Sequence, residues 1–181
     1  MLNREQVRAA QARAVRMMKK AGIALTPAEA SSIEVADLGL GELARTGLEI
    51  LVYVNTDRYC AKELVLFPRQ TCPQHKHPPV GGCPGKMETF RCRWGSVFIY
   101  TPGRPAKRPR ARPPHGSERY YTVRHETALK PGEQLTIPPN TMHWFQAGPG
   151  GAIVSEFSSR SRDGSDVFQD PRIRRATKVA S

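Results

Sequence analysis

Apolar side chains recur at every third or fourth position in the N-terminal part of the chain, the spacing of one face of an α-helix. The residues that set this spacing are Val7, Ala10, Ala14, Met17, Met18 and Ala21. Because Asn3 can cap such a helix, the pattern predicts a helix from Asn3 to about Ala21. In residues 26–30, TPAEA, a proline occupies the first helical position and Glu29 follows Thr26 by three residues, which predicts a second, short helix.

Beyond residue 47 the pattern changes to short segments rich in β-branched and aromatic residues, which are typical of strands. These segments span residues 48–56, 60–67, 88–101, 119–130, 133–139 and 151–157. Turn-forming residues bound them at 55–57, 68, 95, 102–116, 131–132, 138–140 and 148–151. Many evenly spaced short strands predict a β-sandwich or a β-barrel. We therefore expect a mainly β protein.

The same pattern suggests how the chain is organised. We expect an N-terminal helical segment, residues 1–48, that packs on a barrel of residues 49–160. The polar C-terminal tail, residues 161–181, should wrap the surface of that barrel. No tandem repeat is present.

Length and composition fit one globular domain. The chain has 181 residues, of which 39% are hydrophobic and 24% charged, enough for a sizeable core. It contains no run of about 18 apolar residues, and its N-terminus lacks the apolar core of a secretory signal, so we expect no membrane span. Four cysteines in a chain of this length fit a reducing compartment better than a disulfide framework, which predicts a cytoplasmic location.

Lysine and arginine exceed aspartate and glutamate by 28 − 16 = 12 residues, an excess that can indicate nucleic acid, a membrane surface or phosphorylated ligands. Much of this charge lies in residues 102–119, which contain too many prolines to sit inside a helix or a sheet. We interpret this segment as a long solvated loop, with a binding role as the alternative. No nucleic-acid-binding motif accompanies the charge, so we expect no nucleic-acid partner.

Candidate metal ligands gather around the segment CPQHKHPPVGGCPGKMETF, residues 72–90. His75 and His77 are two residues apart, so on a strand both imidazoles point to one face and can share one cation. Glu88 begins the next strand-like segment, and His143 follows a strand and a Pro-Pro-Asn turn. Three imidazoles and one carboxylate suit Mn, Fe, Co, Ni or Zn, and four protein ligands leave open positions for catalysis in an octahedral site.

The cysteines of this segment offer an alternative. Cys72 with His75, and His77 with Cys83, have spacings that are compatible with a structural zinc site. Such a site would require the Gly/Pro-rich loop to fold over the metal, and it would leave His143 without a role. An HxH pair alone is a weak signal, because histidine pairs also occur on surfaces by chance.

Two longer stretches resemble the two cupin motifs. The second motif matches closely in PGEQLTIPPNTMHWFQAG, where its residues are Gly132, Pro138, Asn140 and His143, separated by five, one and two residues. The first, PRQTCPQHKH…GKMETFRCRWG, has ten residues between His77 and Glu88, more than is usual. This longer loop, followed by GKxETFRxRWG, is similar to the D-lyxose isomerase family of cupins in its short bacterial form. GLEILVYVNTDRYCAKELVLFPRQTCPQHKHP, GAIVSEFSS and DVFQDPRI agree with the same family.

The resemblance implies a single cupin β-barrel, or jelly roll, that holds one divalent metal, usually Mn²⁺. It implies an enzyme that interconverts an aldose with its 2-ketose: D-lyxose with D-xylulose, and also D-mannose with D-fructose. The metal ligands of the family carry over to His75, His77, Glu88 and His143. The matching lysines Lys62 and Lys86 would contact substrate oxygens. Glu156 matches one member of the catalytic acidic pair, and its partner could be Asp163 or Asp166.

These residue types suit the chemistry. Moving a carbonyl from C1 to C2 requires a base that takes the C2 proton and returns one to C1, through a cis-enediol that a metal would stabilise. We expect Glu156 to carry this proton, and the second acid or a lysine such as Lys86 to move a proton between O1 and O2. Trp144 is a candidate sugar contact, although aromatic residues near such ligands pack in the core more often.

Two other functions remain compatible with the sequence. Cupins with similar ligands also bind Fe(II) and oxygen, so a dioxygenase is one alternative, and a non-catalytic sugar-binding cupin is another. The chain has no Gly-rich phosphate loop and no nucleotide signature, so no organic cofactor is expected. We expect a homodimer, because two-fold dimers are the commonest oligomers.

Overall fold

Both predicted helices are present in the computed structural model, which describes residues 2–176 and 179–180. The first, α1 (Arg4–Lys20), is capped by the side chain of Asn3, and the second, α2 (Pro27–Ser32), by that of Thr26. In the described part of the chain, no helix is long and apolar enough to cross a membrane.

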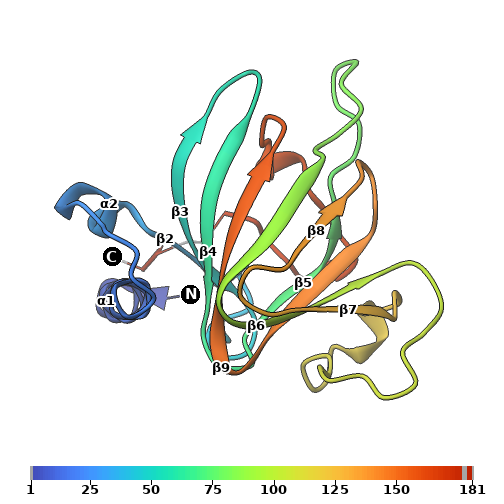
Figure 1. Ribbon diagram of the computed structural model, residues 1–181, viewed down its shortest axis with the longest axis horizontal. Coiled ribbons are helices and arrows are strands. Elements are labelled where there is room, and N and C mark those ends of the chain that lie inside the picture. Colours follow the sequence, from blue (N-terminus) through green and yellow to red (C-terminus); the bar gives the residue numbers. More distant parts are fainter. Residues whose placement is uncertain (1, 177–178, 181) are drawn as a thin grey trace.

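Strands make up most of the remaining structure, as predicted. They are β1 (Leu2–Asn3), β2 (Glu34–Ala36), β3 (Leu48–Asn55), β4 (Cys60–Leu66), β5 (Thr71–Lys76), β6 (Glu88–Thr101), β7 (His125–Leu129), β8 (Gln134–Ile137), β9 (His143–Ser158), β10 (Val167–Phe168) and β11 (Val179–Ala180). The main sheet has the order β10-β5-β9-β4-β3-β2, and β6 pairs with β7, β8 and β9. The sheet curls on itself into a barrel, with α1 and α2 on one side (Figure 1).

The two longest strands bend at glycines where the sequence predicted turns. Gly95 in β6 has a φ of +74° and Gly151 in β9 has a φ of +90°, conformations that glycine adopts without strain. A Cβ atom on Gly95 would lie 2.1 Å from the Gly151 carbonyl oxygen, so the two strands can approach this closely only without one. Each strand therefore continues past its glycine and changes partner there, β6 from β8 to β7 and β9 from β5 to β4. The segment predicted over residues 88–101 is therefore one strand, whereas the predicted strand boundary at residues 148–151 is wrong, because β9 continues through it.

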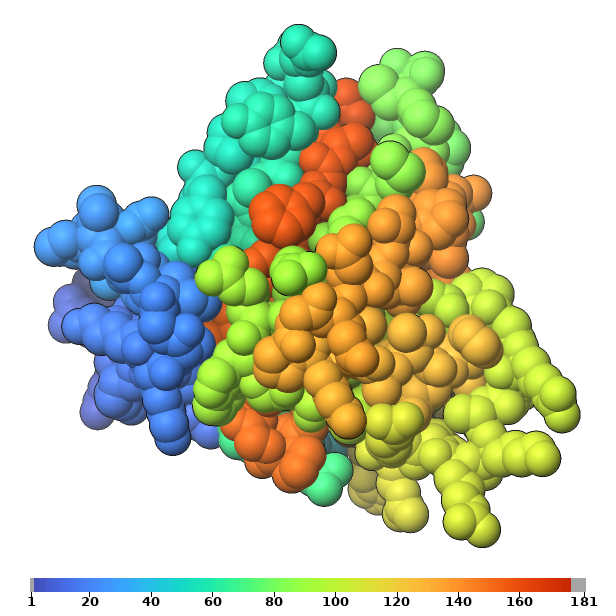
Figure 2. Space-filling model, in the orientation of Figure 1, coloured from blue at the N-terminus to red at the C-terminus, as the bar shows by residue number. Residues whose placement is uncertain are grey.

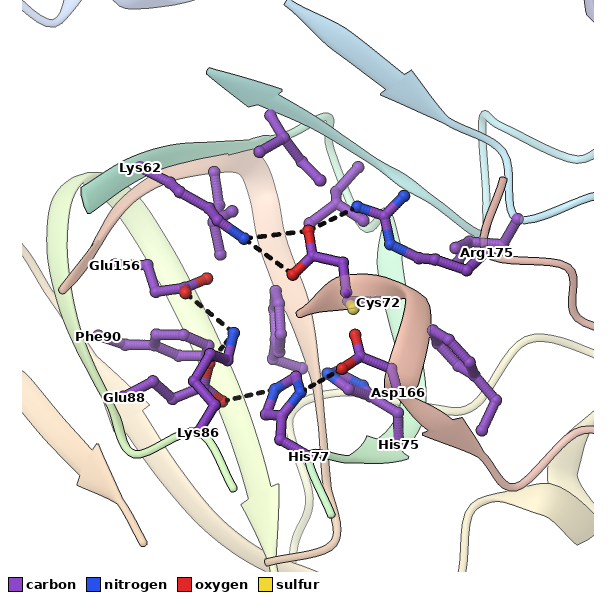
Figure 3. A pocket seen from close by; sticks show the side chains of 17 residues that line it. Lys62, Cys72, His75, His77, Lys86, Glu88, Phe90, Glu156, Asp166 and Arg175 are labelled. Carbon is purple, nitrogen blue, oxygen red and sulfur yellow. Dashed lines mark hydrogen bonds and ion pairs between the residues drawn. The ribbon is translucent and has the colours of Figure 1, made fainter. Parts of the chain in front are cut away.

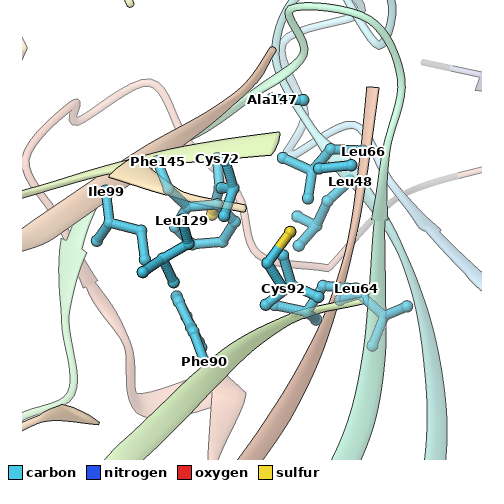
Figure 4. Packing of buried hydrophobic residues seen from close by; sticks show 14 of the residues in the cluster. Leu48, Leu64, Leu66, Cys72, Phe90, Cys92, Ile99, Leu129, Phe145 and Ala147 are labelled. Carbon is cyan, nitrogen blue, oxygen red and sulfur yellow. The ribbon is translucent and has the colours of Figure 1, made fainter. Parts of the chain in front are cut away.

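Apolar side chains form three clusters: one inside the barrel, one between α1 and the outer face of the sheet, and one around Tyr100 and Trp144. The interior cluster includes Leu48, Leu64, Leu66, Cys72, Phe90, Cys92, Ile99, Leu129, Phe145 and Ala147 (Figure 4). Outside, Ala14 and Met18 of α1 pack against Val65 and Ile153 of the sheet. Alternation along β4 separates the interior cluster from the one beneath α1, because Leu64 and Val65 point to opposite faces of the strand.

The basic segment, residues 102–119, is largely exposed but anchored to the barrel. Its long side chains extend into solvent at the lower right of Figure 2. Beneath them, the Ala111 amide donates a 3.0 Å hydrogen bond to the Tyr100 hydroxyl, and Arg110 Nε lies 3.1 Å from Glu126 Oε1. The strand predicted over residues 119–130 is shorter than expected, because only residues 125–129 pair with β6.

The tail after β9 is attached to the barrel by strand pairing and by ion pairs. β10 pairs with β5, placing Phe168 opposite His75. Arg175 forms ion pairs with Glu34 of β2 and with Asp163, which lies in the short 3-10 helix η2 (Asp163–Ser165). The tail therefore links β2 and β5, which are not neighbours in the sheet.

One buried carboxyl group outside the barrel affects stability. Glu49 of β3 is fully buried, its Oε1 atom lies 3.4 Å from the Gln70 amide nitrogen, and its Oε2 atom has no hydrogen-bond partner among the described residues. Burial raises the pKa of Glu49 to about 8, against smaller lowering contributions from Gln70 and Arg13. The folded protein therefore holds a proton here that the unfolded chain releases near pH 4.5.

We expect this proton to make the protein less stable as the pH rises. Between about pH 5 and 8 the unfolded carboxyl group is ionised while the folded one is still protonated, so the free energy of unfolding should fall by up to about 1.4 kcal/mol per pH unit from this group. Glu49→Gln should remove that slope, with urea unfolding across this pH range as the measurement. Glu5→Gln, at an exposed position of α1, is the control. Parallel stability curves for wild type and Glu49→Gln would contradict the prediction.

Candidate active site

The candidate site lies in the barrel interior, above the apolar core. Alternation along three neighbouring strands brings Lys62 (β4), Glu156 (β9) and Phe90 (β6) into one row, since Glu156 is paired with both of the others. Glu88 lies two residues before Phe90 in β6, opposite Ser158. These residues line a cavity of about 40 Å³, which the tail closes (Figure 3).

Three histidines meet at one wall of this cavity. A bulge in the pairing of β5 with β9, between Cys72 and His75, lets both of these side chains face inward. His75 is paired with His143 of β9, and His77 follows two residues later. The nitrogens that the three imidazoles can offer to a metal all lie within 4.8 Å of one another.

Each histidine has a fixed orientation. His75 Nδ1 donates a hydrogen bond to the Pro73 carbonyl oxygen at 2.8 Å, and His143 Nδ1 donates to that of Thr141 at 2.9 Å. Carbonyl oxygens only accept, so these contacts set the tautomer and leave Nε2 of both rings as a potential ligand. His77 Nδ1 lies 2.5 Å from Oδ1 of Asp166, so its Nε2 is likewise left for a metal.

Buried polar atoms without partners mark the place for a cation. Among the described residues, His77 Nε2, His143 Nε2 and Glu88 Oε1 are buried and form no hydrogen bond. Glu88 Oε1 is 3.0 Å from His143 Nε2 and 3.4 Å from His77 Nε2. Two adjacent ligands of one octahedral ion lie about 3 Å apart when each bond is about 2.1 Å. The three histidines could therefore bind one divalent metal, and Glu88 lies close enough to two of them to join it.

The cysteines do not join this group. Cys72 lies at the cavity floor, packed in the apolar core, where burial raises the pKa of its thiol well above the usual range. Cys83 Sγ is 3.6 Å from Arg162 Nη2. Neither joins the three histidines in the group of potential metal ligands found in residues 2–176 and 179–180, so the structure favours a site at the histidine cluster over the structural zinc site.

A buried lysine joins the metal ligand to the candidate base. Lys86 Nζ is 2.7 Å from Glu88 Oε2 and 2.9 Å from Glu156 Oε1 (Figure 3). Burial alone would lower the pKa of Lys86, but the two carboxylates outweigh it and hold that pKa well above its usual range. Burial would likewise raise the pKa of Glu88, but Lys86 and the histidines hold it well below its usual range. The site therefore holds the Lys86 ammonium group between the side chains of Glu88 and Glu156.

The two tail acids have different partners. Asp163 receives hydrogen bonds of 3.1 Å from Lys62 Nζ to both of its oxygens, and Arg175 Nη2 lies 2.9 Å from its Oδ2. Although burial opposes it, Lys62 lowers the pKa of Asp163 well below the usual range. Asp166 instead contacts His77.

The structure corrects the expectation for Trp144. This residue is adjacent to His143 in β9, so its side chain points out of the barrel when that of His143 points in. The indole stacks on Tyr100 with ring centroids 4.0 Å apart, and its Nε1 donates to the Val123 carbonyl oxygen. Trp144 supports the wall beneath the basic segment and does not line the cavity.

Sequence reasoning missed three residues of the site, all in the tail. Ser161 Oγ accepts a 2.8 Å hydrogen bond from Lys62 Nζ, Arg175 lines the cavity beside Asp163, and Phe168 stacks on His75 with ring centroids 5.2 Å apart. The segment DVFQDPRI matched the family and contains Phe168, but only the pairing of β10 with β5 shows which ring it contacts.

Comparison with known proteins identifies the family of this chain. The model of the family described as D-lyxose isomerase matches residues 9–181. A D-lyxose/D-mannose isomerase of Thermosediminibacter oceani is 63% identical over 179 residues, covering 99% of both chains. A D-lyxose ketol-isomerase of Cohnella laeviribosi is 66% identical over 168 residues, covering 93% of this chain and 92% of that protein.

Solved structures show the same fold. The L-ribose isomerase of Cellulomonas parahominis superposes with a TM-score of 0.80 over 99% of this chain and 98% of its own, at 16% identity. That of Acinetobacter sp. DL28, complexed with L-ribose, also gives 0.80 over the same shares, at 14% identity. Together with the curled sheet, this likeness confirms the predicted cupin-type barrel with N-terminal helices. Over nearly its whole length, the chain is 61–66% identical to proteins named as isomerases of D-lyxose. The chain therefore belongs to the D-lyxose isomerase family of sugar isomerases.

Proposed function

We propose that this protein converts D-lyxose to D-xylulose, and D-mannose to D-fructose, in the cytoplasm. The names of its relatives support the substrates. The observation in the structure that carries the proposal is the placement of Glu156, joined through Lys86 to Glu88 at the edge of the histidine cluster. This arrangement puts a carboxylate next to the place where a metal-bound sugar would expose its C1 and C2.

His75, His77, Glu88 and His143 would hold the metal, for which we propose Mn²⁺. When bound, a divalent cation polarises the sugar oxygens and so acidifies the C2 hydrogen. Three of these residues, His75, Glu88 and His143, come from paired strands that hold them in a nearly fixed arrangement, and His77 directly follows β5. The other divalent metals that suit nitrogen and oxygen ligands, Zn, Co, Ni and Fe, would fit the same donors.

Glu156 would carry the proton between C2 and C1. Its carboxylate lines the cavity and accepts hydrogen bonds from Lys86 and from Ser158, so its direction is set before the sugar binds. A positioned carboxylate on one face of a cis-enediol can remove the proton from one carbon and return it to the other. Lys86 remains beside it as a fixed positive charge.

Lys62 and Asp163 would act on the oxygens of the sugar. Lys62 Nζ lies at the cavity wall, where Ser161 and Asp163 hold it. A sugar hydroxyl could replace one of these contacts without leaving the ammonium group unpaired. We therefore assign Lys62 to substrate binding and Asp163 to its orientation, with Lys86 as the second lysine near the reacting carbons.

The cavity must widen to receive a sugar. Its volume of about 40 Å³ is only about three times the roughly 10–15 Å³ that a cavity needs to hold one water molecule. Much of its outer wall is tail: Asp163, Asp166, Phe168 and Arg175. We infer that this wall moves when a monosaccharide binds. We also propose that the enzyme is a homodimer.

A panel of aldoses tests the proposal. We expect the Mn²⁺-loaded protein to form D-xylulose from D-lyxose and D-fructose from D-mannose, and to lose both activities after EDTA treatment. L-Ribose and D-xylose should be poorer substrates. Sugar binding without any ketose would favour the non-catalytic cupin, and oxygen consumption by the Fe(II)-loaded protein would favour the dioxygenase.

A further inference from the structure

We propose that Asp166 is a positioning residue for the metal centre, which acts by holding His77 in place. The inference rests on the proposed function in one respect, namely that the histidine cluster binds a divalent metal. It changes the role expected for Asp166, from an acid that exchanges protons with the sugar to the carboxylate that orients a metal ligand.

The three histidines differ in what holds their outer nitrogen. His75 and His143 each donate to the carbonyl of the residue two positions earlier in the chain, so these contacts are local. The Nδ1 atom of His77 lies 2.5 Å from Asp166, which is 89 residues away in the tail. Of the three outer ring nitrogens, only that of His77 is therefore held by a distant segment of the chain.

The location of His77 explains why it needs such a partner. β5 ends at Lys76, so His77 is the first residue beyond the strand, and its own backbone pairing does not fix its ring. A carboxylate at Nδ1 fixes both the tautomer and the ring plane of a metal-bound histidine, and it makes the other nitrogen a stronger donor to the metal. A backbone carbonyl supplies less of this polarisation, because it carries no net charge.

The tail places Asp166 through contacts on both sides of it. On one side, Asp163 is held by Lys62 and Arg175. On the other, β10 pairs with β5 and Phe168 stacks on His75. Asp166 cannot leave His77 without disturbing one of these contacts, so the same docked tail that closes the sugar cavity also completes the surroundings of the metal.

The test measures metal affinity, by competition between the metal-free protein and a chelator for Co²⁺ and for Mn²⁺. We expect Asp166→Ala to weaken both affinities by about 10- to 100-fold, the range found when a carboxylate partner of a metal-bound histidine is removed. Asp166→Asn keeps an acceptor oxygen but loses the charge, so its loss should be near tenfold. The visible spectrum of the Co²⁺ form should change in both variants, because the ligand field depends on the orientation of His77.

Asp163→Asn is the matched control. It makes the same charge change three residues away, in the same segment, at a carboxylate that contacts no histidine. We expect its metal affinity to stay within about threefold of wild type. An equal loss in Asp163→Asn and Asp166→Ala would overturn the proposal, because the effect would then come from tail docking in general. Wild-type affinity and an unchanged Co²⁺ spectrum in Asp166→Ala would overturn it too.

Two further arms make the outcome decisive. If Asp166→Ala does not fold, as judged by circular dichroism of the metal-free protein, the affinity of Asp166→Asn decides the question by the same criterion. In a His77→Ala background, Asp166→Ala should cause no further loss of Co²⁺ affinity, and an additional loss as large as in wild type would show that Asp166 acts elsewhere. None of these experiments measures sugar turnover. The proposed isomerase activity and the proposed role of Asp166 can therefore be refuted independently of each other.

Discussion

Glu156→Gln should keep its metal and its sugar but turn over at least about a hundredfold more slowly than wild type, the lower range for losing a positioned base. Glutamine has the shape of glutamate and can still accept a hydrogen bond from Lys86, so the cavity should retain its form. It cannot take a proton from C2. The measurements are kcat for ketose formation, metal content, and exchange of the substrate C2 hydrogen with solvent deuterium.

The protein offers a matched control for this substitution. Glu63 is also a buried glutamate, one residue beyond Lys62 in β4, but its carboxylate points out of the barrel and accepts a 2.8 Å hydrogen bond from Ser155 Oγ. Glu63→Gln should leave turnover near that of wild type. Near-normal turnover in Glu156→Gln would exclude Glu156 as the base and transfer the role to Asp163 or to a lysine.

Removal of any metal ligand should have a comparably large effect. His75→Ala, His77→Ala, Glu88→Ala and His143→Ala should each lose bound metal and nearly all turnover. Each removes one of four bonds, and Glu88→Ala also leaves Lys86 with a single carboxylate partner in a buried site. Metal content after dialysis and ketose formation at saturating sugar are the measurements, with circular dichroism to show that each variant folds.

The cysteines provide the comparison for these variants. Cys72→Ser and Cys83→Ser should retain metal, since neither thiol lies among the potential ligands in the described residues. A result in which the cysteine variants lose metal while Glu88→Ala keeps it would support the structural zinc site instead.

Much of the fold could be predicted because it is encoded in local patterns. A helix can be recognised by apolar side chains that recur every three or four residues. Both α1 and α2 begin directly after residues whose side chains cap them. β5 shows the limit of this approach. Its sequence, TCPQHK, has little strand character, and it becomes a strand through pairing with β9 and β10, which lie far away in the chain.

The sequence by itself predicted the three histidines that the structure brings together, because His75 and His77 are two residues apart and His143 belongs to a motif with recognisable spacing. Strand alternation also places Glu156 and Phe157 on opposite faces of their segment. Only the tertiary structure decided the partners of Asp163 and Asp166, the role of Arg175, and the outward direction of Trp144. The physical reason is that spacing within a strand sets only relative faces. Which face meets the cavity, and which distant acid meets which base, depends on strand register and tail packing, and these arise from contacts up to 141 residues apart.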